Sequence, residues 1–106
     1  MVTLRGFTNH KGVAKGKAKI VSSKSDLKNV RIGSIVVLES MDREFITAFF
    51  RASAVLIESE STTTRDALIA RQLDIPMITG VKNLMSTVRN DSFVMVNGNT
   101  GEVFID

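Results

Sequence analysis

The chain has 106 residues, with 14 Lys and Arg against 11 Asp and Glu, a formal net charge of +3 and 43% hydrophobic side chains. It contains no cysteine and one histidine, which excludes disulfide frameworks, thiolate metal sites and His-rich metal sites, and we expect neither a metal nor a cofactor. No apolar run approaches the ~20 residues of a membrane helix and the N-terminus lacks a signal-peptide core, so we expect one soluble, cytoplasmic domain spanning 1–106.

Apolar and basic side chains alternate over residues 13–21, which is the period-2 pattern of a half-buried strand. Gly12 and Gly16 flank and interrupt this strand, and they predict a turn and either a bulge or a close backbone approach. The basic excess of the first half of the chain lies at Lys11, Lys15, Lys17, Lys19, Lys24 and Lys28. A basic stripe can bind nucleic acid, but no aromatic side chains alternate with these lysines to stack bases. We therefore interpret them as a solvated strand face.

Short buried strands and helices are predicted for the middle of the chain. Residues 22–32 are polar and lysine-rich, and we expect a loop or short helix there. Residues 35–38 and 54–57 are continuous apolar runs, typical of strands that are buried on both faces. Between them, residues 41–51 are a helix candidate. Four apolar residues are expected on one side of that helix: Phe45, Ile46, Phe49 and Phe50.

A helix with clear start and stop signals is predicted between Glu60 and Pro76. Thr63 and Asp66 have the spacing of a capping box, in which the hydroxyl accepts from a helix N–H and the carboxylate reaches back to the cap. The residues that follow are good helix formers, which predicts a helix over 64–73. Pro76 ends it, because the residue before a proline is pushed out of the α region.

The start of this helix is a candidate anion site, since it presents free backbone N–H groups beside several hydroxyls. The residues that could contact an anion or an acidic partner are Thr62, Thr63, Thr64 and Arg65. The helix macrodipole disfavours a cation in the first turn, so Arg65 breaks a local rule, which is a hint of function. The other interpretation is a solvated arginine whose charge is offset by Glu60 and Asp66.

The C-terminal third predicts a strand at 76–79, one or two helical turns at 83–88 and a β-hairpin. The hairpin strands are 93–96 and 102–105, joined by a glycine-containing loop. Strands therefore alternate with helices in the middle of the chain, with antiparallel strands at both ends. This order predicts a mixed α/β domain.

Five segments of the chain also carry a family resemblance. They read GVAKGKA at 12–18, GSIVVL at 33–38, AVLI at 54–57, ALIARQLDIPMITGV at 67–81 and VMVNG…GEV at 94–103. In this order they resemble the phosphohistidine swivelling (mobile) domain of phosphoenolpyruvate-utilising enzymes. Pyruvate phosphate dikinase, phosphoenolpyruvate synthase and enzyme I of the sugar phosphotransferase system carry such a domain. The resemblance implies a swivelling three-layer β/β/α domain with a mixed sheet, two main helices and a C-terminal β-hairpin.

The active loop of that family reads Gly-Gly-x-Thr-Ser-His and precedes the same helix. Thr63 matches the threonine, and Thr64 replaces the serine by another hydroxyl. Glu60 and Ser61 stand at the two glycines, and Arg65 stands at the phosphoacceptor histidine. Guanidinium has no free lone pair and does not deprotonate, so Arg65 cannot be a phosphate-carrying nucleophile.

The sequence favours two functions over nucleic-acid binding through the lysines and over a purely structural or oligomerising role. The first is a degenerate mobile domain without histidine phosphotransfer or catalytic residues, which acts as a binding or regulatory module for an anion or an acidic partner. The alternative is a subunit or fragment of a multi-part, dikinase- or synthase-like phosphotransferase. In that case nucleotide-binding or phosphoenolpyruvate-binding domains on other chains supply the chemistry. We expect no nucleic-acid or membrane partner, and we expect His10 to be hydrogen-bonded or exposed rather than a substitute phosphoacceptor.

Overall fold

The computed structural model describes residues 1–61 and 63–106, and within these ranges the strands form an 8-stranded mixed sheet. The strands are β1 (Val2–Arg5), β2 (Phe7–His10), β3 (Val13–Ile20), β4 (Ser34–Leu38), β5 (Ala52–Ile57), β6 (Met77–Thr79), β7 (Phe93–Asn97) and β8 (Glu102–Ile105). Their spatial order is β1-β8-β7-β3-β4-β5-β6-β2. Parallel pairs join β3 to β4, β4 to β5 and β5 to β6, and the remaining pairs are antiparallel.

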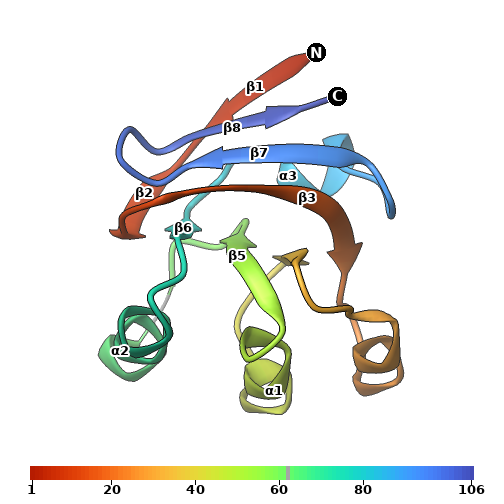
Figure 1. The fold of residues 1–106 in the computed structure, drawn as a ribbon, viewed down its shortest axis with the longest axis vertical. Helices are drawn as coiled ribbons and strands as arrows, with labels where there is room; N and C mark the ends of the chain where they lie inside the picture. Colours follow the sequence, from red (N-terminus) through yellow and green to blue (C-terminus); the bar gives the residue numbers. More distant parts are fainter. Residues whose placement is uncertain (62) are drawn as a thin grey trace.

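The sheet folds over into two β layers because β3 belongs to both. Its first part, Val13–Lys17, pairs with β7, and its last part, Ala18–Ile20, pairs with β4. Figure 1 shows β1, β8, β7 and β3 above β4, β5 and β6, with helices below the second layer. The predicted three-layer β/β/α fold is thereby confirmed.

The helical layer consists of short segments and one longer helix. The segments are the 3-10 helices η1 (Lys24–Asn29) and η2 (Arg43–Phe45) and the α-helices α1 (Ile46–Phe49), α2 (Thr64–Leu73) and α3 (Leu84–Thr87). Figure 1 places η1, α1 and α2 side by side beneath the sheet, with α2 at one edge. In the part of the chain that the structure describes, no helix is long and apolar enough to cross a membrane.

Two hydrophobic clusters hold the three layers together, one on each side of the central strands. Ile35 and Val37 of β4 belong to the cluster between the two β layers. Val36 and Leu38 of the same strand belong to the cluster between the second β layer and the helices. All four side chains are fully buried, which is why this stretch reads as a continuous apolar run without alternation.

Two expectations need correction. The helix predicted over 41–51 is instead a 3-10 turn followed by the single α-helical turn α1. It starts late because the Asp42 side chain caps the 3-10 turn by accepting from Glu44 N. It ends early because the chain must already be extended for β5 at Ala52. Phe50, expected on the same side of this helix as Phe45 and Phe49, is 66% exposed, whereas the other two are buried. The strands β1 and β2, which no pattern in residues 1–10 predicts, form the two ends of the sheet.

Candidate functional site

The start of α2 has the predicted capping box. Thr63 adopts an extended conformation, and its Oγ1 accepts a hydrogen bond from Asp66 N at 3.1 Å. The Asp66 carboxylate accepts in return from Thr63 N at 3.4 Å, and this side chain is buried. The helix begins at Thr64 and ends at Leu73, as expected, and Asp74 terminates it in the left-handed conformation. Thr62, a predicted site residue, lies outside the described residues.

The first turn of α2 offers backbone donors to solvent. Thr63 Oγ1 already accepts from Asp66 N, and Ala67 N donates to the Thr63 carbonyl at 3.2 Å. Within the described ranges, no acceptor pairs with the backbone N–H of Thr64 or Arg65, and both residues are exposed. These two N–H groups carry the partial positive charge of the helix terminus.

A second arginine stands next to this turn. Arg43, which sequence reasoning missed as a site residue, lines a hollow of about 220 Å³ together with Arg65 and Thr63. The remaining lining residues are Met41, Ile46 and Asp66. The hollow arises where η2 and α1 pack beside α2, so two arginines from separate elements border one space. The ion pairs within the described ranges include neither arginine.

The two acidic residues near Arg65 in the sequence, Glu60 and Asp66, line different hollows. Asp66 lines the same hollow, where its single charge opposes those of Arg43 and Arg65. Glu60 instead lines a different hollow of about 560 Å³ with Phe7 and Lys82. Two arginines and one aspartate therefore line the hollow at the start of α2, which leaves an excess of positive charge.

The loop that leads to α2 is held by ordinary backbone geometry. Ser59 N donates to the Glu39 carbonyl at 2.9 Å, and Ser61 N donates to Ser59 Oγ at 3.1 Å. Neither Glu60 nor Ser61 is among the described non-glycine residues with positive φ. The loop thus uses no conformation that requires glycine at these two positions.

His10 lies at the other end of α2. Its Nε2 is 2.9 Å from Asp74 Oδ1, and its side chain is 14% exposed, so the expectation of a hydrogen-bonded histidine is confirmed. Because a helix rises about 1.5 Å per residue, the length of α2 separates the ring from Arg65 by over ~10 Å along the helix axis. The imidazole is therefore remote from the candidate site.

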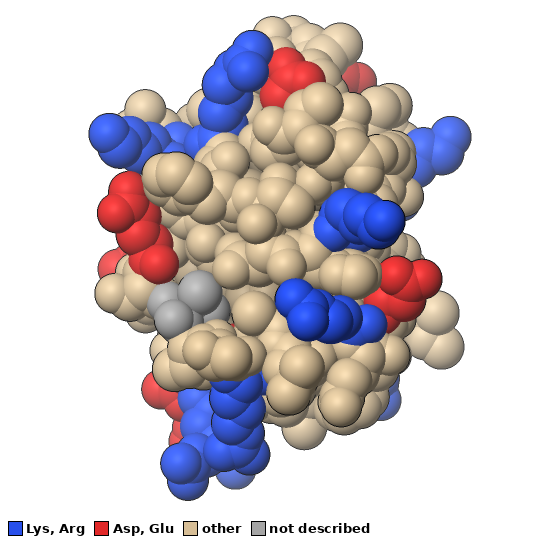
Figure 2. Space-filling model, turned by 90° about the vertical axis from the view of Figure 1, so that its left-hand side faces the viewer, with Lys and Arg blue, Asp and Glu red and all other residues tan. Residues whose placement is uncertain are grey.

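Charged side chains are distributed unevenly around this part of the molecule. Figure 2 shows the side on which α2 lies in Figure 1; the middle of this face is mostly uncharged, with two basic side chains to the right of its centre. Further basic side chains stand at the upper edges and gather at the lower end, the end of the helical layer. An anion approaching this face therefore meets positive charge at the helical end.

Comparison with known proteins identifies the fold and the family. A sequence model of the family described as "PEP-utilising enzyme, mobile domain" matches residues 30–101. The probable phosphoenolpyruvate synthase of Methanothermobacter thermautotrophicus is 27% identical over 103 residues, which cover 97% of this chain and 15% of that protein. The chain thus spans a small part of the curated relatives that it matches.

Solved structures share the same fold. The aconitase X structure from Thermococcus kodakaraensis has a TM-score of 0.75 at 18% identity, and the match covers 100% of this chain and 99% of that one. A solution structure of an Enzyme I protein has a TM-score of 0.66 at 22% identity, covering 76% of this chain and 33% of that one. At these identities the likeness concerns the fold alone.

Proposed function

This chain belongs to the family of mobile domains of phosphoenolpyruvate-utilising enzymes, and we propose that it acts there as a binding or regulatory module without histidine phosphotransfer. The proposed ligand is an anionic group, either a small phosphate or carboxylate or an acidic side chain of a partner. It would contact Arg65 and the threonine residues at the start of α2, with Arg43 as an additional donor.

The loss of phosphotransfer follows from the chemistry of the side chains. By the resemblance of its loop, the chain has Arg65 where the family has a phosphoacceptor histidine. A guanidinium group has five donors and no acceptor, so it cannot attack a phosphoryl group. His10 has the required imidazole, but its Nε2 is engaged by Asp74 at the far end of α2.

The anion-binding proposal rests on one observation, the shared hollow of Arg43 and Arg65. Guanidinium donates two parallel hydrogen bonds to a carboxylate or phosphate, and such charge-assisted bonds are roughly twice as strong as neutral ones. The N–H groups of Thr64 and Arg65, for which no described residue supplies an acceptor, add donors that point along the helix axis. A volume of about 220 Å³ suits a small anion or a single acidic side chain rather than a large cofactor.

A thermal-shift screen tests the binding half of the proposal. Phosphoenolpyruvate, pyrophosphate and simple anions are added to the parent and to the variants Arg65→Ala, Arg43→Ala and Arg71→Ala. A ligand at ten times its Kd should raise the Tm by about 5 °C. We expect the shift to disappear in the first two variants and to persist in Arg71→Ala, which alters the last turn of the same helix. A shift that all three variants retain contradicts the proposed site.

A phosphorylation assay tests the other half. The protein is incubated with phosphoenolpyruvate and a pyruvate phosphate dikinase, whose own histidine domain serves as the positive control. We expect no acid-labile phosphate on this chain. Acid-labile labelling that survives Arg65→Ala and vanishes in His10→Ala would overturn the proposal.

The alternative function is a subunit of a multi-part phosphotransferase. It is favoured by the small share of its relatives that the chain covers, 15% of the phosphoenolpyruvate synthase described above. Other domains of such relatives are then the expected partners, on separate chains. Genes for nucleotide-binding and phosphoenolpyruvate-binding domains beside this one, with co-purification of the three products, would favour the subunit. A chain that purifies and binds its anion alone would favour the module.

A further inference from the structure

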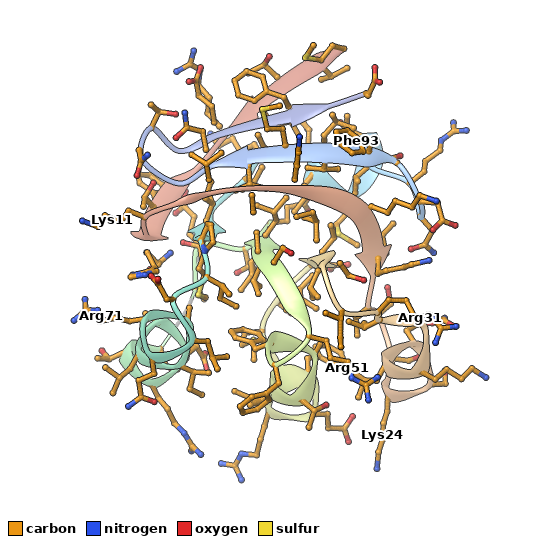
Figure 3. All side chains as sticks on the ribbon, viewed as in Figure 1. Lys11, Lys24, Arg31, Arg51, Arg71 and Phe93 are labelled. Atoms are coloured by element: carbon orange, nitrogen blue, oxygen red, sulfur yellow. The ribbon has the colours of Figure 1, made fainter. Side chains whose placement is uncertain are left out.

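A second basic hollow lies on the opposite side of the helical layer from α2. It measures about 320 Å³ and is lined by Lys17, Lys19, Arg31, Ile32, Gly33, Ser34 and Asp91. An adjoining hollow of about 280 Å³ shares Lys19, Arg31 and Asp91. This hollow shares no lining residue with the Arg43–Arg65 hollow. Figure 3 shows Arg31 at the η1 side of the molecule and Arg71 at the α2 side.

The local sequence explains why cations from two elements border one space. Lys17 and Lys19 alternate along β3 and therefore project from the same face of the strand. The loop of Arg31 comes close to this strand because Gly16 has no side chain: a Cβ there would lie 2.5 Å from the Gly33 carbonyl oxygen. The loop is fixed, since Arg31 N donates to Ser34 Oγ at 2.9 Å and Ser34 N donates to the Arg31 carbonyl at 3.0 Å.

One carboxylate lies among these three cations. Asp91 Oδ1 is 2.6 Å from Lys19 Nζ, and Asp91 N donates to the Ala18 carbonyl at 2.9 Å, which holds the residue in place. The hydrogen bond from Lys19, then the charges of Lys19 and Lys17, keep the pKa of Asp91 below its usual range. Lys17 and Arg31 are exposed, and no described ion pair includes them, so the hollow retains net positive charge.

We propose that this hollow binds the phosphate groups of a small, multiply charged phosphorylated molecule, of which pyrophosphate is the simplest example. Arg31 and Lys17 would contact the phosphate oxygens from opposite sides, with the guanidinium supplying the paired donors. Asp91 repels every anion, so a singly charged ligand binds with little favourable free energy. A ligand with two or more negative charges is attracted by all three cations and binds more tightly. Ile32, 91% exposed at the rim, offers an apolar contact to the organic part of such a molecule.

A single-stranded nucleic acid is the less favoured occupant. Phe93 is paired with Lys17 across β3 and β7, which gives one stacking surface beside the lysines. Sequence-tolerant strand binding relies on successive aromatic side chains and a continuous basic track. Here Lys19 pairs with Asp91, and the three basic residues border one hollow rather than following a groove.

An NMR titration of the amide-labelled protein with sodium pyrophosphate, at constant ionic strength, tests the proposal. We expect saturable shifts at residues 17–19, 31–34 and 91. Losing one charge-assisted hydrogen bond should weaken binding about 10-fold or more, so we expect this loss for Arg31→Gln and a similar one for Lys17→Gln. Lys24→Gln is the matched control for removing a positive charge elsewhere, and we expect it to bind as the parent does.

Asp91→Asn gives the most specific readout, because it should raise the affinity for pyrophosphate about 10-fold by removing the competing carboxylate. Asn tolerates the positive φ of 70° at this position, so the fold should be kept, and an unchanged Tm checks this.

Any of four outcomes overturns the inference. The first three are the absence of saturable shifts at millimolar pyrophosphate, an Asp91→Asn variant that binds more weakly than the parent, and an oligonucleotide that binds more tightly than pyrophosphate and is released by Phe93→Ala. Shifts confined to the surroundings of Arg43 and Arg65 also overturn it, while leaving the proposed function intact. The reverse pattern, with shifts at residues 17–19, 31–34 and 91 and none around Arg43 and Arg65, supports this inference and contradicts the proposed site at α2.

Discussion

Nε2 of His10 lies 2.9 Å from Oδ1 of Asp74, so the end of β2 is joined to the C-terminal end of α2. β2 is the last strand of the sheet and pairs with β6 on one side only. The contact therefore fixes an edge strand to the helix that bears the candidate site.

We expect His10→Ala to lower the free energy of unfolding by about 1 kcal/mol, the net value of a typical hydrogen bond. Urea denaturation followed by circular dichroism measures this. Asp74→Asn is the control, because Asn also tolerates the left-handed φ of 54° and its amide oxygen still accepts from the ring. It should lose less stability than His10→Ala, and an equal or larger loss would show that the pair acts through charge instead.

The cap of α2 gives a second prediction. Thr63→Ala removes the acceptor for Asp66 N and should destabilise the protein by about 1 kcal/mol. Thr63→Ser keeps the hydroxyl and should change stability by only a few tenths of a kcal/mol. Amide hydrogen exchange of residues 64–67 should become faster in the alanine variant than in the serine variant. Equal exchange in both would mean that the capping box contributes nothing to the helix start.

Whether an element could be predicted depended on whether its signals are local, which explains both the correct prediction of α2 and the missed strand β1. The signals for α2 are local: Thr63 and Asp66 satisfy each other, and Pro76 blocks continuation whatever surrounds it. β1 is defined by partners far away in the sequence, such as Val2 opposite Ile105. A four-residue strand whose side chains are mostly exposed carries no alternation that could reveal it.

The residues of the candidate site also differ in whether local sequence predicts them. The hydroxyl and guanidinium at the start of α2 could be predicted, because both belong to one helix turn. Arg43 joins Arg65 only through the packing of η2 and α1 beside α2, which no periodicity in either segment specifies. The signal that could have suggested it is the position of Arg43 in the first turn of a neighbouring helix.

Gly16 leads to a third prediction, on packing between backbones. A methyl group there would lie 2.5 Å from the Gly33 carbonyl oxygen, closer than real contacts allow, so β3 or the loop must move. We expect Gly16→Ala to cost about 2 kcal/mol, within the usual range for overpacking. Gly33→Ala is the comparison, because its Cβ would have open space, the nearest atom being Ser53 Oγ at 3.8 Å, but its φ of +93° disfavours a side chain. A smaller loss in Gly16→Ala than in Gly33→Ala would contradict the close approach.

Asp26 gives the last prediction, on acid stability. Its Oδ2 accepts from Ser22 N at 2.9 Å and from Ser23 N at 3.1 Å, and these bonds lower the pKa of the carboxyl. A lowered pKa means that the folded state binds its proton less readily than the unfolded chain does. The stabilisation is therefore complete above the unfolded pKa of about 3.9 and is lost as the pH falls through the folded pKa.

We accordingly expect Asp26→Asn to be less stable than the parent at pH 6 and to converge with it as the pH falls below 4. Urea unfolding at several pH values measures the difference. Asp106→Asn, at the exposed C-terminus, controls for the removal of one carboxylate. The difference in the free energy of unfolding between Asp26→Asn and the parent could instead stay constant from pH 6 to pH 3. That result would mean that the two backbone hydrogen bonds do not distinguish the charged carboxylate from the neutral one.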